Sequence, residues 1–537
     1  MHDTQDTIAA IATAPGAAGL AVVRLSGPRA LAVADAVFEG GARLADAPGQ
    51  TLHHGWVVSP GGRSSADAAP GGRAAGDAAP RAHAPGGGTS GARAPGEGPA
   101  GDRAVLDEVV AAVFRAPRSY TREDVVELSC HGGLLPAGRV LAALLAAGAR
   151  LARPGEFTLR AFLNGRVDLA QAEAVADLVQ AETTAAHALA LSQLRGELSR
   201  RLAAVAESLR EAAAEVEARV DFAEDVGGVE VPGHVVEAVA AAEAALRALL
   251  AGAAYARAVR EGVRVAIVGR PNAGKSSLFN ALLGERRAIV ASAPGTTRDL
   301  VSESLEVAGV RVTLADTAGL HEGADEVEGE GVARARAALE ESAVALWVVD
   351  ASAPLTAEDR WIAARLVGRR ALVALNKCDL PGVVGSRDVE SLLGSCEVEG
   401  SAVPGLSSAA APGLTGAACR VVAVSATRGD GVGDLLEALS ALLGAGGPRE
   451  AEAWRGRAGG PHAAGLTGAV ANPRHVEALE RARAALVRAR ESAATGAPGE
   501  IVALELRESL AAIGEVTGEA VGEDLLERIF ARFCIGK

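Results

Sequence analysis

The residues whose types and spacing suggest chemistry most directly lie at 269–276. This segment, GRPNAGKS, fits the pattern G-x-x-x-x-G-K-[ST], follows a β-like apolar run and opens a helix-like one, which is the context that the pattern needs. Its glycines let backbone N–H groups curl around phosphate oxygens at the helix N-terminus. We expect Lys275 to bridge the β- and γ-phosphates and the Ser276 hydroxyl to ligate Mg²⁺. The segment therefore predicts a nucleotide site.

Two motifs further along the chain indicate that the base is guanine. Residues 376–379, NKCD, follow an apolar run, and Asp379 can accept hydrogen bonds from guanine N1–H and N2–H₂, which adenine does not offer. The Lys377 stem would cover the base, and residues 425–427, SAT, would supply backbone N–H to guanine O6. These motifs favour GTP over ATP.

Two more motifs are suited to the γ-phosphate and its metal ion. In DTAG, residues 316–319, Asp316 would hold Mg²⁺ through water and the Gly319 N–H would sense the γ-phosphate, while Thr297 of GTTRD offers a second hydroxyl ligand for Mg²⁺. The strand-end motifs should converge, because parallel strands end at one sheet edge. Together the motifs predict GTP contacts from Asn272, Ala273, Gly274, Lys275, Ser276, Ser277, Thr297, Asp316, Thr317, Ala318, Gly319, Asn376, Lys377, Asp379, Ser425, Ala426 and Thr427.

The residues that would drive hydrolysis are less evident. Leu320 follows Gly319, at the place where many small GTPases carry a glutamine, and a leucine cannot orient water. No single arginine stands out as a finger in cis, so another group must supply charge compensation and water alignment. A switch that hydrolyses GTP only weakly remains an alternative at this point.

Composition excludes several classes of protein. Of 537 residues, 49% are hydrophobic, too many for a wholly disordered chain, and the formal charge of −14 excludes a grip on nucleic acid by bulk positive charge. The five cysteines form no C-x-x-C pair, which argues for a reduced compartment and against structural zinc. Without a signal-peptide pattern or a run of about 18 apolar residues, we expect a soluble cytoplasmic protein with no membrane partner.

Lysine usage supports the nucleotide site. The chain has only three lysines, Lys275, Lys377 and Lys537, whereas its other basic residues are all arginine. Because a compact ammonium and a planar guanidinium are not interchangeable, we expect lysine where arginine would not serve. Two of the three lysines fall in the nucleotide motifs.

The chain reads as three domain types. Short β-like runs at 20–25, 56–58, 105–114 and 125–128 predict one α+β domain, interrupted by residues 59–102, which lack any large apolar residue and predict a disordered insertion. Helical periodicity from 168 to 220 and about 235–258 returns near 475–490, 501–513 and 522–533. Between these blocks, strands at 263–268, 310–315, 345–349, 371–375 and 421–424 alternate with helices, which is typical of a doubly wound, mostly parallel sheet.

The economical architecture inserts the α/β domain into an all-α helical domain. Independent domains in series remain the alternative. The expected divisions are an N-terminal α+β domain (1–130), the first part of the helical domain (131–261), an α/β P-loop GTPase domain (262–446, with a loop insertion at 381–420), and a linker with the second helical part (447–537).

Four blocks of sequence resemble the MnmE (TrmE) family of tRNA modification GTPases. They are residues 6–28, 117–133, 152–179 and the C-terminal CIGK at 534–537, together with the nucleotide motifs. The resemblance implies a folate-binding N-terminal domain that forms a homodimer, a helical domain, and a G domain inserted within it. It also implies GTP hydrolysis that K⁺ stimulates when two G domains meet.

The resemblance further implies particular ion and catalytic residues. K⁺ would be held by the Asn272 side chain and by the loop of Ala291, Ala293 and Thr296, where the alanines could offer only backbone carbonyls. It extends the GTP contacts to Ala291, Ser292 and Thr296. Glu328 matches the family's catalytic glutamate, which would orient the attacking water.

For the folate, the resemblance implies four contacts to 5-formyl-tetrahydrofolate or a related one-carbon folate. These are Arg24, Glu127, Arg166 and Lys537; the family commonly has lysine at position 166, where this chain has arginine. A reduced pterin carries donors suited to a carboxylate, and its glutamate tail suits basic groups.

The implied reaction installs an aminomethyl-type group at C5 of a tRNA wobble uridine. A flavin-dependent partner of the MnmG type would join the homodimer in a heterotetramer, and the one-carbon unit would come from the folate. A Cys534 thiolate could act as a nucleophile toward the uridine ring, although a lone helical cysteine more often packs. His131 is expected to stabilise a turn rather than act as a base.

Two rival functions remain. A ribosome-assembly GTPase of the Era-like type would need an RNA-binding module such as a KH domain with its GXXG loop, and the folate-like block and CIGK terminus argue against it. A degenerate scaffold would bind GTP without turnover.

Overall fold

The computed structural model describes residues 5–60, 103–221, 230–285, 302–316, 339–394, 420–443, 466 and 468–537. The chain divides into two compact units, Met1–Glu173 with Gly518–Lys537, and Ala174–Thr517. Among the described helices, none is both long and apolar enough to cross a membrane. Most of the predicted insertion, residues 61–102, lies outside the described residues.

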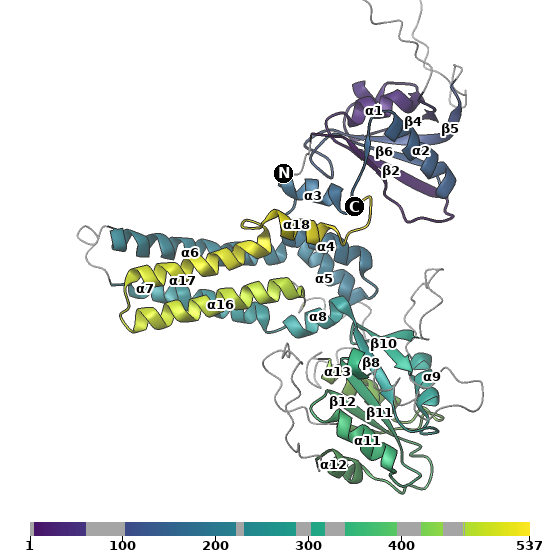
Figure 1. Ribbon diagram of the computed structural model, residues 1–537, viewed down its shortest axis with the longest axis vertical. Helices are drawn as coiled ribbons and strands as arrows, with labels where there is room; N and C mark the ends of the chain where they lie inside the picture. Colours follow the sequence, from purple (N-terminus) through teal and green to yellow (C-terminus); the bar gives the residue numbers. More distant parts are fainter. Residues whose placement is uncertain are drawn as a thin grey trace, which may run out of the picture. The chain divides into compact units, whose positions relative to one another are not determined.

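The first unit is built on a seven-stranded sheet of order β3-β4-β5-β6-β2-β1-β7 (Figure 1). Its strands are β1 (Ile8–Ile11), β2 (Leu20–Ser26), β3 (Phe38–Gly40), β4 (Thr51–Val58), β5 (Val105–Phe114), β6 (Val125–His131) and β7 (Arg150–Leu151). The sequence predicted β2, β5, β6 and the end of β4. It missed β1, β3 and β7, which have two to four residues each and are too short for a period-two pattern to stand out.

Helices α1 (Ala30–Val37) and α2 (Leu134–Ala146) cover one face of this sheet. Their apolar residues share a core with alternate residues of the strands, such as Val23, Val109 and Leu128. The intervening strand residues, which include Arg24 and Glu127, therefore lie on the opposite face. This unit also contains η1 (Leu44–Asp46), α3 (Glu156–Leu163) and α18 (Glu523–Phe530).

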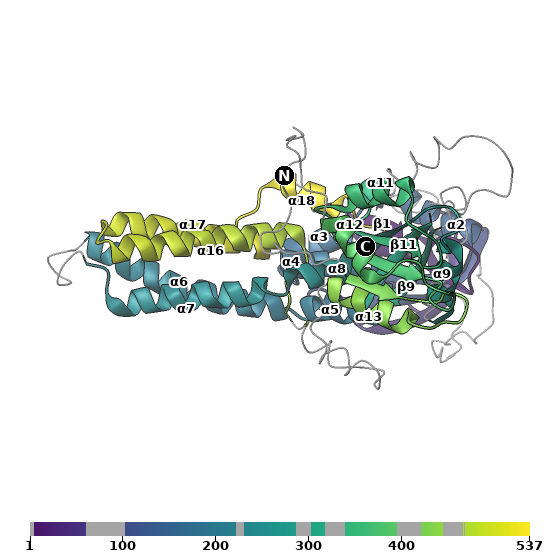
Figure 2. The ribbon, with the colours of Figure 1, turned by 90° about the horizontal axis from the view of Figure 1, so that it is seen from below.

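The second unit begins with a helical block. Figure 2 shows four long helices side by side, namely α6 (Glu197–Asp221), α7 (Gly233–Leu250), α16 (Pro473–Ala494) and α17 (Gly499–Thr517). The predicted helical character from 168 to 220 is confirmed, and the structure divides it into α4 (Leu169–Gln180), α5 (Thr184–Leu194) and α6. The Thr183 hydroxyl caps α5 by accepting from the Ala186 N–H at 3.1 Å, and Gly196 takes a positive φ of 73° before α6.

The α/β part of this unit has a six-stranded sheet of order β13-β12-β11-β8-β10-β9, in which all neighbours are parallel except β9 and β10. Its strands are β8 (Val263–Val268), β9 (Ser302–Val307), β10 (Val310–Asp316), β11 (Val344–Asp350), β12 (Ala371–Asn376) and β13 (Arg420–Ala423). The sequence missed β9, which begins with three polar residues and alternates polar and apolar side chains only over residues 304–307.

Helices cover both faces of this sheet. On one face lie α9 (Lys275–Glu285) and α13 (Val432–Leu442), and on the other lie α11 (Ala357–Leu366) and α12 (Ser386–Gly394). Successive residues of β8 point into the two cores, Val265 and Ile267 into one and Ala266 and Val268 into the other. The sheet is therefore doubly wound, as the sequence predicts.

The predicted loop insertion at 381–420 needs a correction. Its first part forms α12, in which Val389 is buried and Leu392 and Leu393 pack against the same core. The spacing of these three residues suits one helical face, and the surrounding glycine-rich sequence hid it. Residues 395–419 lie outside the described residues.

Two hydroxyls from the helical block hold the turn between β9 and β10. Thr183 Oγ1 donates to the Gly309 carbonyl at 2.8 Å, and the Tyr255 hydroxyl of α8 (Ala253–Glu261) donates to the Ala308 carbonyl at 2.8 Å. Ala308 and Gly309 both have positive φ, of 55° and 76°, as a two-residue hairpin turn requires.

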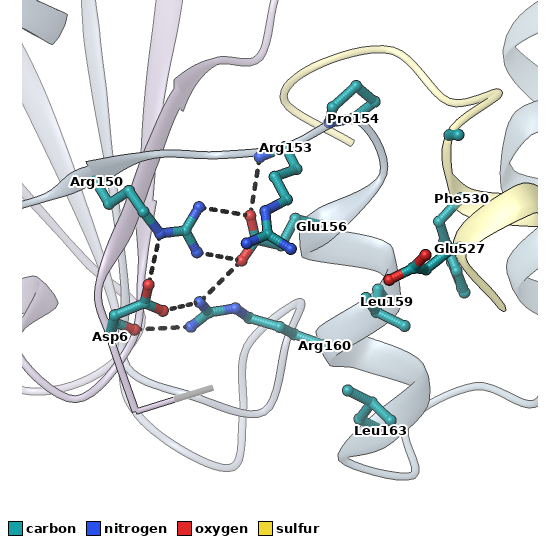
Figure 3. Close-up of a pocket in the computed structure, with 11 residues that line it drawn as sticks. Asp6, Arg150, Arg153, Pro154, Glu156, Leu159, Arg160, Leu163, Glu527 and Phe530 are labelled. Carbon is teal, nitrogen blue, oxygen red and sulfur yellow. Dashed lines mark hydrogen bonds and ion pairs between the residues drawn. The ribbon is translucent and has the colours of Figure 1, made fainter. Parts of the chain in front are cut away.

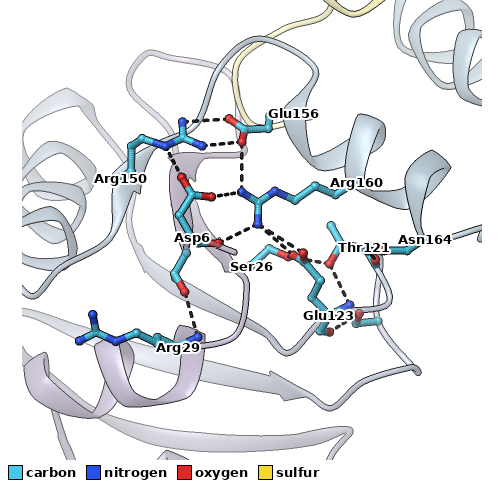
Figure 4. Close-up of polar contacts among 11 residues, drawn as sticks. Asp6, Ser26, Arg29, Thr121, Glu123, Arg150, Glu156, Arg160 and Asn164 are labelled. Atoms are coloured by element: carbon cyan, nitrogen blue, oxygen red, sulfur yellow. Dashed lines mark hydrogen bonds and ion pairs between the residues drawn. The ribbon is translucent and has the colours of Figure 1, made fainter. Parts of the chain in front are cut away.

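A buried guanidinium ties the first unit together (Figure 4). Arg160 of α3 is 1% exposed and contacts three carboxylates. They belong to Asp6 before β1, Glu123 before β6 and Glu156 one turn earlier on α3 itself. Arg150 of β7 donates to Asp6 and Glu156 at 2.6 Å each. The ion pairs thus fix α3 against the sheet.

The carboxyl groups in this network are held ionised. Burial alone would raise the pKa of Glu156, but hydrogen bonds from Arg150, the Arg153 backbone and Arg160 outweigh it and lower that pKa. The pKa of Asp6 is lowered in the same way, with burial opposed by Arg150 and Arg160. A carboxyl pKa below its unfolded value stabilises the fold above that value and loses this contribution as pH falls through the folded pKa.

We predict that Arg160→Met destabilises the first unit by about 3–5 kcal/mol near pH 7, because three carboxylates lose a buried partner. The difference in the free energy of unfolding between this variant and the unmodified chain should become smaller as the pH falls below the ordinary pKa values of 4.5 and 3.8 for Glu156 and Asp6. Urea unfolding, followed by hydrogen exchange in peptides from β2, β6 and α3, measures it. The exposed Arg118→Met is the control, and equal midpoints for the two variants would contradict the prediction.

Candidate functional site

The phosphate-binding segment joins β8 to α9. Lys275 is the first residue of α9, and its Nζ donates to the Gly269 and Arg270 carbonyls at 2.7 and 2.9 Å. Gly274 has a φ of 94°, and a Cβ there would lie 2.1 Å from Asn376 Nδ2, so glycine is required. Ser276 is exposed, which leaves its hydroxyl accessible to an ion.

Asn376, at the end of β12, joins the phosphate loop to the loop after β13. Its Nδ2 donates to the Ala273 carbonyl at 2.9 Å, and its Oδ1 accepts from the Ala426 N–H at 3.0 Å. The side chain is 2% exposed. One amide therefore fixes the relative positions of the predicted phosphate and guanine loops, which lie more than a hundred residues apart in the chain.

The groups predicted to face the base differ in their exposure. Asp379 and Thr427 are exposed, and Ser425 is buried with its N–H donating to the Asp430 carbonyl at 2.9 Å. Lys377 has a φ of 66° and its Nζ donates to Asp350 at 2.8 Å. The structure thus brings the phosphate, base-reading and SAT loops to one sheet edge.

Several predicted residues lie outside the described residues. They are Ala291, Ser292, Ala293, Thr296, Thr297, Thr317, Ala318, Gly319 and Glu328. Asp316 ends β10 next to β8, with its backbone paired to Ile267, so the motif that it opens starts at the same sheet edge. For Mg²⁺, the hydroxyl of Ser276 is a suitable hard oxygen ligand, and Asn272, exposed with a φ of 63°, carries the amide oxygen predicted to hold K⁺.

The four residues predicted to contact a folate gather in the first unit. Arg24 and Glu127 are directly opposite each other on β2 and β6, and Arg24 Nε donates to Glu127 Oε1 at 2.7 Å. Arg24 Nη1 also donates to the carbonyl of Gly536, next to the terminal Lys537, at 3.4 Å. The chain end is thereby joined to the sheet.

Tyr120 completes this cluster, and sequence reasoning missed it. The Cζ atoms of Arg24 and Arg166 lie over its ring, 5.1 and 4.7 Å from the centroid. Arg166 Nη1 donates to the Tyr120 carbonyl at 3.0 Å, and the Tyr120 hydroxyl is 2.9 Å from Thr158 Oγ1 on α3. Tyr120 lies in the block at 117–133 that carries the family resemblance, so the sequence did point to this segment. The role of the ring itself depends on long-range contacts.

Arg166 retains donors for a ligand. Its side chain is exposed and its contacts are with Tyr120, whereas Arg24 is already bonded to Glu127. The arrangement can offer a carboxylate edge to amine donors and a cationic group to an anion.

The surroundings of the described cysteines and of His131 give less support for a chemical role. Cys534 is exposed, and its carbonyl accepts from the Gly155 N–H at 3.4 Å. Cys130 is buried, and burial together with Asp107 raises its pKa to about 11, so it is a poor nucleophile. His131 Nδ1 lies 2.7 Å from Asp107, whose hydrogen bond and charge raise the histidine pKa, in keeping with a local structural role.

A cavity of about 240 Å³ lies elsewhere in this unit, between α3 and α18 (Figure 3). One wall carries Arg150, Glu156 and Arg160, which pair with one another and with Asp6, and the other carries Leu159 and Phe530. The lining as a whole is balanced in charge, with Arg150, Arg153 and Arg160 against Asp6, Glu156 and Glu527, so the cavity is less suited to an anionic ligand than the exposed Arg166 of the Tyr120 cluster.

Comparison with known proteins gives matches over nearly the whole chain. Residues 169–534 match the family model of the MnmE helical domain, and residues 7–70 and 89–166 match that of the GTP-binding protein TrmE N-terminus. The tRNA modification GTPase MnmE of Chloroflexus aurantiacus is 42% identical over 533 residues, covering 99% of this chain and 100% of that protein. Those of Geobacter sulfurreducens and Symbiobacterium thermophilum are 40% and 41% identical, with 99% of this chain and 99% and 100% of those proteins covered.

We predict that Asn376→Ala weakens guanine-nucleotide binding about tenfold to a hundredfold, because two buried hydrogen bonds between the loops are lost. Calorimetric titration with GDP and Mg²⁺ measures the change. Asn472→Ala, which removes the cap of α16 outside the site, is the matched control and should bind GDP like the unmodified chain. Equal affinities for the two variants would show that Asn376 does not organise the site.

Proposed function

The chain belongs to the MnmE (TrmE) family of tRNA modification GTPases, and from this membership we propose that it hydrolyses GTP to drive modification of tRNA wobble uridines. A flavin-dependent partner of the MnmG type joins it in a heterotetramer, and together they install an aminomethyl-type group at uridine C5. The folate supplies the one-carbon unit, and GTP hydrolysis drives domain rearrangement without entering the modification chemistry.

The observation that carries the GTPase part is the convergence of loops around Asn376. Phosphate, base and SAT loops meet at one sheet edge, as GTP binding requires. The N-terminal match over residues 7–70 and 89–166 argues against the alternative of an Era-like ribosome-assembly switch.

We propose the motif residues as the machinery of hydrolysis. Lys275 and the backbone of the phosphate loop bind the phosphates, Ser276 and Thr297 ligate Mg²⁺, and Asp379 reads the guanine. K⁺, held by Asn272 with Ala291, Ala293 and Thr296, supplies the positive charge that an arginine finger provides elsewhere. Glu328 orients the attacking water, which Leu320 cannot do.

The Tyr120 cluster is the proposed folate site. The Glu127 carboxylate suits the donors of a reduced pterin, and Arg166 suits the glutamate tail. Arg24 holds Glu127 and the chain end in place, so that Lys537 is kept nearby. A Cys534 nucleophile remains a proposal that rests on its exposure alone.

The sheet face that carries Arg24 and Glu127 is the proposed homodimer face. The register places Leu52, Val110 and Leu20 on this face, opposite α1 and α2. They are 72%, 39% and 65% exposed, and exposed apolar side chains on one sheet face favour burial against another surface. We propose that a second copy of the chain covers this face, because the face also carries Arg24 and Glu127 of the proposed folate site.

GTP turnover should be at least about tenfold faster in KCl than in NaCl at equal ionic strength, because K⁺ compensates transition-state charge. Phosphate release measures it on the full chain with Mg²⁺. Glu328→Ala should keep its GTP affinity and lose most of this turnover. Equal, negligible rates in both salts would favour the scaffold that binds without hydrolysis, and unchanged turnover in the variant would remove the role of Glu328.

The pair Leu52→Asp and Val110→Asp should raise the dimer dissociation constant at least about a hundredfold, because two carboxylates would be desolvated in the interface. Sedimentation of the nucleotide-free protein measures it. The control is Leu504→Asp on α17, where the leucine is 59% exposed, and it should stay dimeric. A double variant that remains a dimer would exclude this face.

Wobble nucleosides from cells that lack this protein should have lost the C5 group. Mass spectrometry of digested tRNA detects the loss, and re-expression of the intact chain should restore the modified nucleoside while Lys275→Ala should not. An unchanged nucleoside profile would overturn the proposed function.

A further inference from the structure

A small charge cluster lies beside the base-reading loop, at the carboxyl end of β11. Asp350 is 7% exposed and is the register partner of Asn376. Its carboxylate accepts from Lys377 Nζ at 2.8 Å and from the Ser352 N–H and hydroxyl at 2.9 and 2.6 Å. None of the sequence motifs includes this aspartate.

The phosphate loop contributes a second cation to the cluster. Arg270 Nη2 lies 3.6 Å from Asp350, and Arg270 Nε lies 3.9 Å from Asp359, which is 1% exposed and forms the capping box of α11 with Thr356. Two cations therefore face two nearly buried carboxylates. The pKa of Asp350 is lowered, since hydrogen bonds from Lys377 and Ser352 and the charge of Lys377 outweigh the effect of burial.

Lys377 benefits from a charged partner such as Asp350 because of its backbone conformation and its long side chain. Its backbone has a φ of 66°, a left-handed conformation that is unfavourable for a residue with a side chain. Its Nζ donates to Asp350, so both ends of its four-carbon stem are held, and Asp379 follows two residues later in the chain. A long flexible side chain otherwise loses conformational entropy when a base comes to lie against it.

We propose that Asp350 is a positioning residue for guanine-nucleotide binding, holding the Lys377 stem in place for the base before the nucleotide arrives. This inference rests on the proposed GTP site. It assigns Asp350 no contact with the nucleotide; its effect passes through the ammonium of Lys377. Arg270 approaches the same carboxylate from the phosphate-loop side.

The consequence is a measurable coupling between the two residues. Asp350→Asn keeps the size of the side chain and loses the charge-assisted bond, so GDP affinity should fall about tenfold. In a Lys377→Met background the stem remains but its anchor is gone, and Asp350→Asn should then change GDP affinity by less than about twofold. A residue that only supports the fold would cost the same factor in both backgrounds.

The experiment is a four-protein cycle on the full chain, titrated calorimetrically with GDP and Mg²⁺. Asp434→Asn, an exposed carboxylate on α13, is the matched control and should bind like the unmodified chain. A non-additive cycle supports the inference, whereas equal losses in both backgrounds overturn it. If the unmodified chain takes up no GDP, the proposed function itself fails, which is a distinguishable result.

A second readout uses the scarcity of lysine. With lysine-selective ¹³C labelling, the chain's three lysines give one ε-methylene signal each, and the signal missing from Lys377→Met identifies Lys377. In the nucleotide-free protein, Asp350→Asn should move this signal to the position of a freely rotating lysine and leave those of Lys275 and Lys537 in place. An unmoved Lys377 signal overturns the inference even where the variant binds GDP weakly.

Discussion

A charge that leaves water must be matched by an opposite charge, and both sites of this chain depend on that requirement. In the first unit, Arg160 is almost fully buried, and the carboxylates that it needs come from three segments far apart in sequence. Satisfying them fixes α3, and α3 in turn supports Tyr120 through Thr158. The proposed folate site therefore inherits its geometry from ion pairs that touch no ligand.

In the second unit a neutral amide and a set of charged side chains satisfy the buried polar groups together. Asn376 uses both atoms of its amide to join two loops, and Asp350 carries the charge that Lys377 and Arg270 balance. Neither residue would contact phosphate. The nucleotide motifs supply the donors and acceptors, whereas these neighbours set the distances between them.

Sequence reasoning predicted that the phosphate, base-reading and SAT loops come together at one sheet edge, because the signals of these motifs are local. A strand, a glycine-rich loop and a helix follow one another over residues 263–285, and each strand-end motif is read without knowledge of the rest of the fold. The doubly wound sheet follows from the alternation of strands and helices. The four missed strands, β1, β3, β7 and β9, lie at or near sheet margins, where pairing partners rather than their own residues decide the conformation.

The Tyr120 cluster was only partly predictable. The predicted folate contacts were named one by one from a family resemblance, but Tyr120 was missed, and the approach of Arg24 and Arg166 to its ring depends on tertiary contacts. The ring also makes physical sense of arginine at position 166. A planar guanidinium stacks on an aromatic face while its edge keeps hydrogen-bond donors, and an ammonium has no such plane. The exchange from the lysine common in the family is thus accommodated by contacts that this chain possesses.

The hydrogen bonds at the turn between β9 and β10 restrict the movement of β10 within the second unit. One end of β10 is Asp316, where the γ-phosphate motif begins, and the other is clamped by hydroxyls from Thr183 and Tyr255. A slide of one residue in a strand covers about 3.4 Å, more than a hydrogen bond can stretch. A displacement of β10 by one residue would therefore either move the segments that carry Thr183 and Tyr255 with it or break both hydrogen bonds.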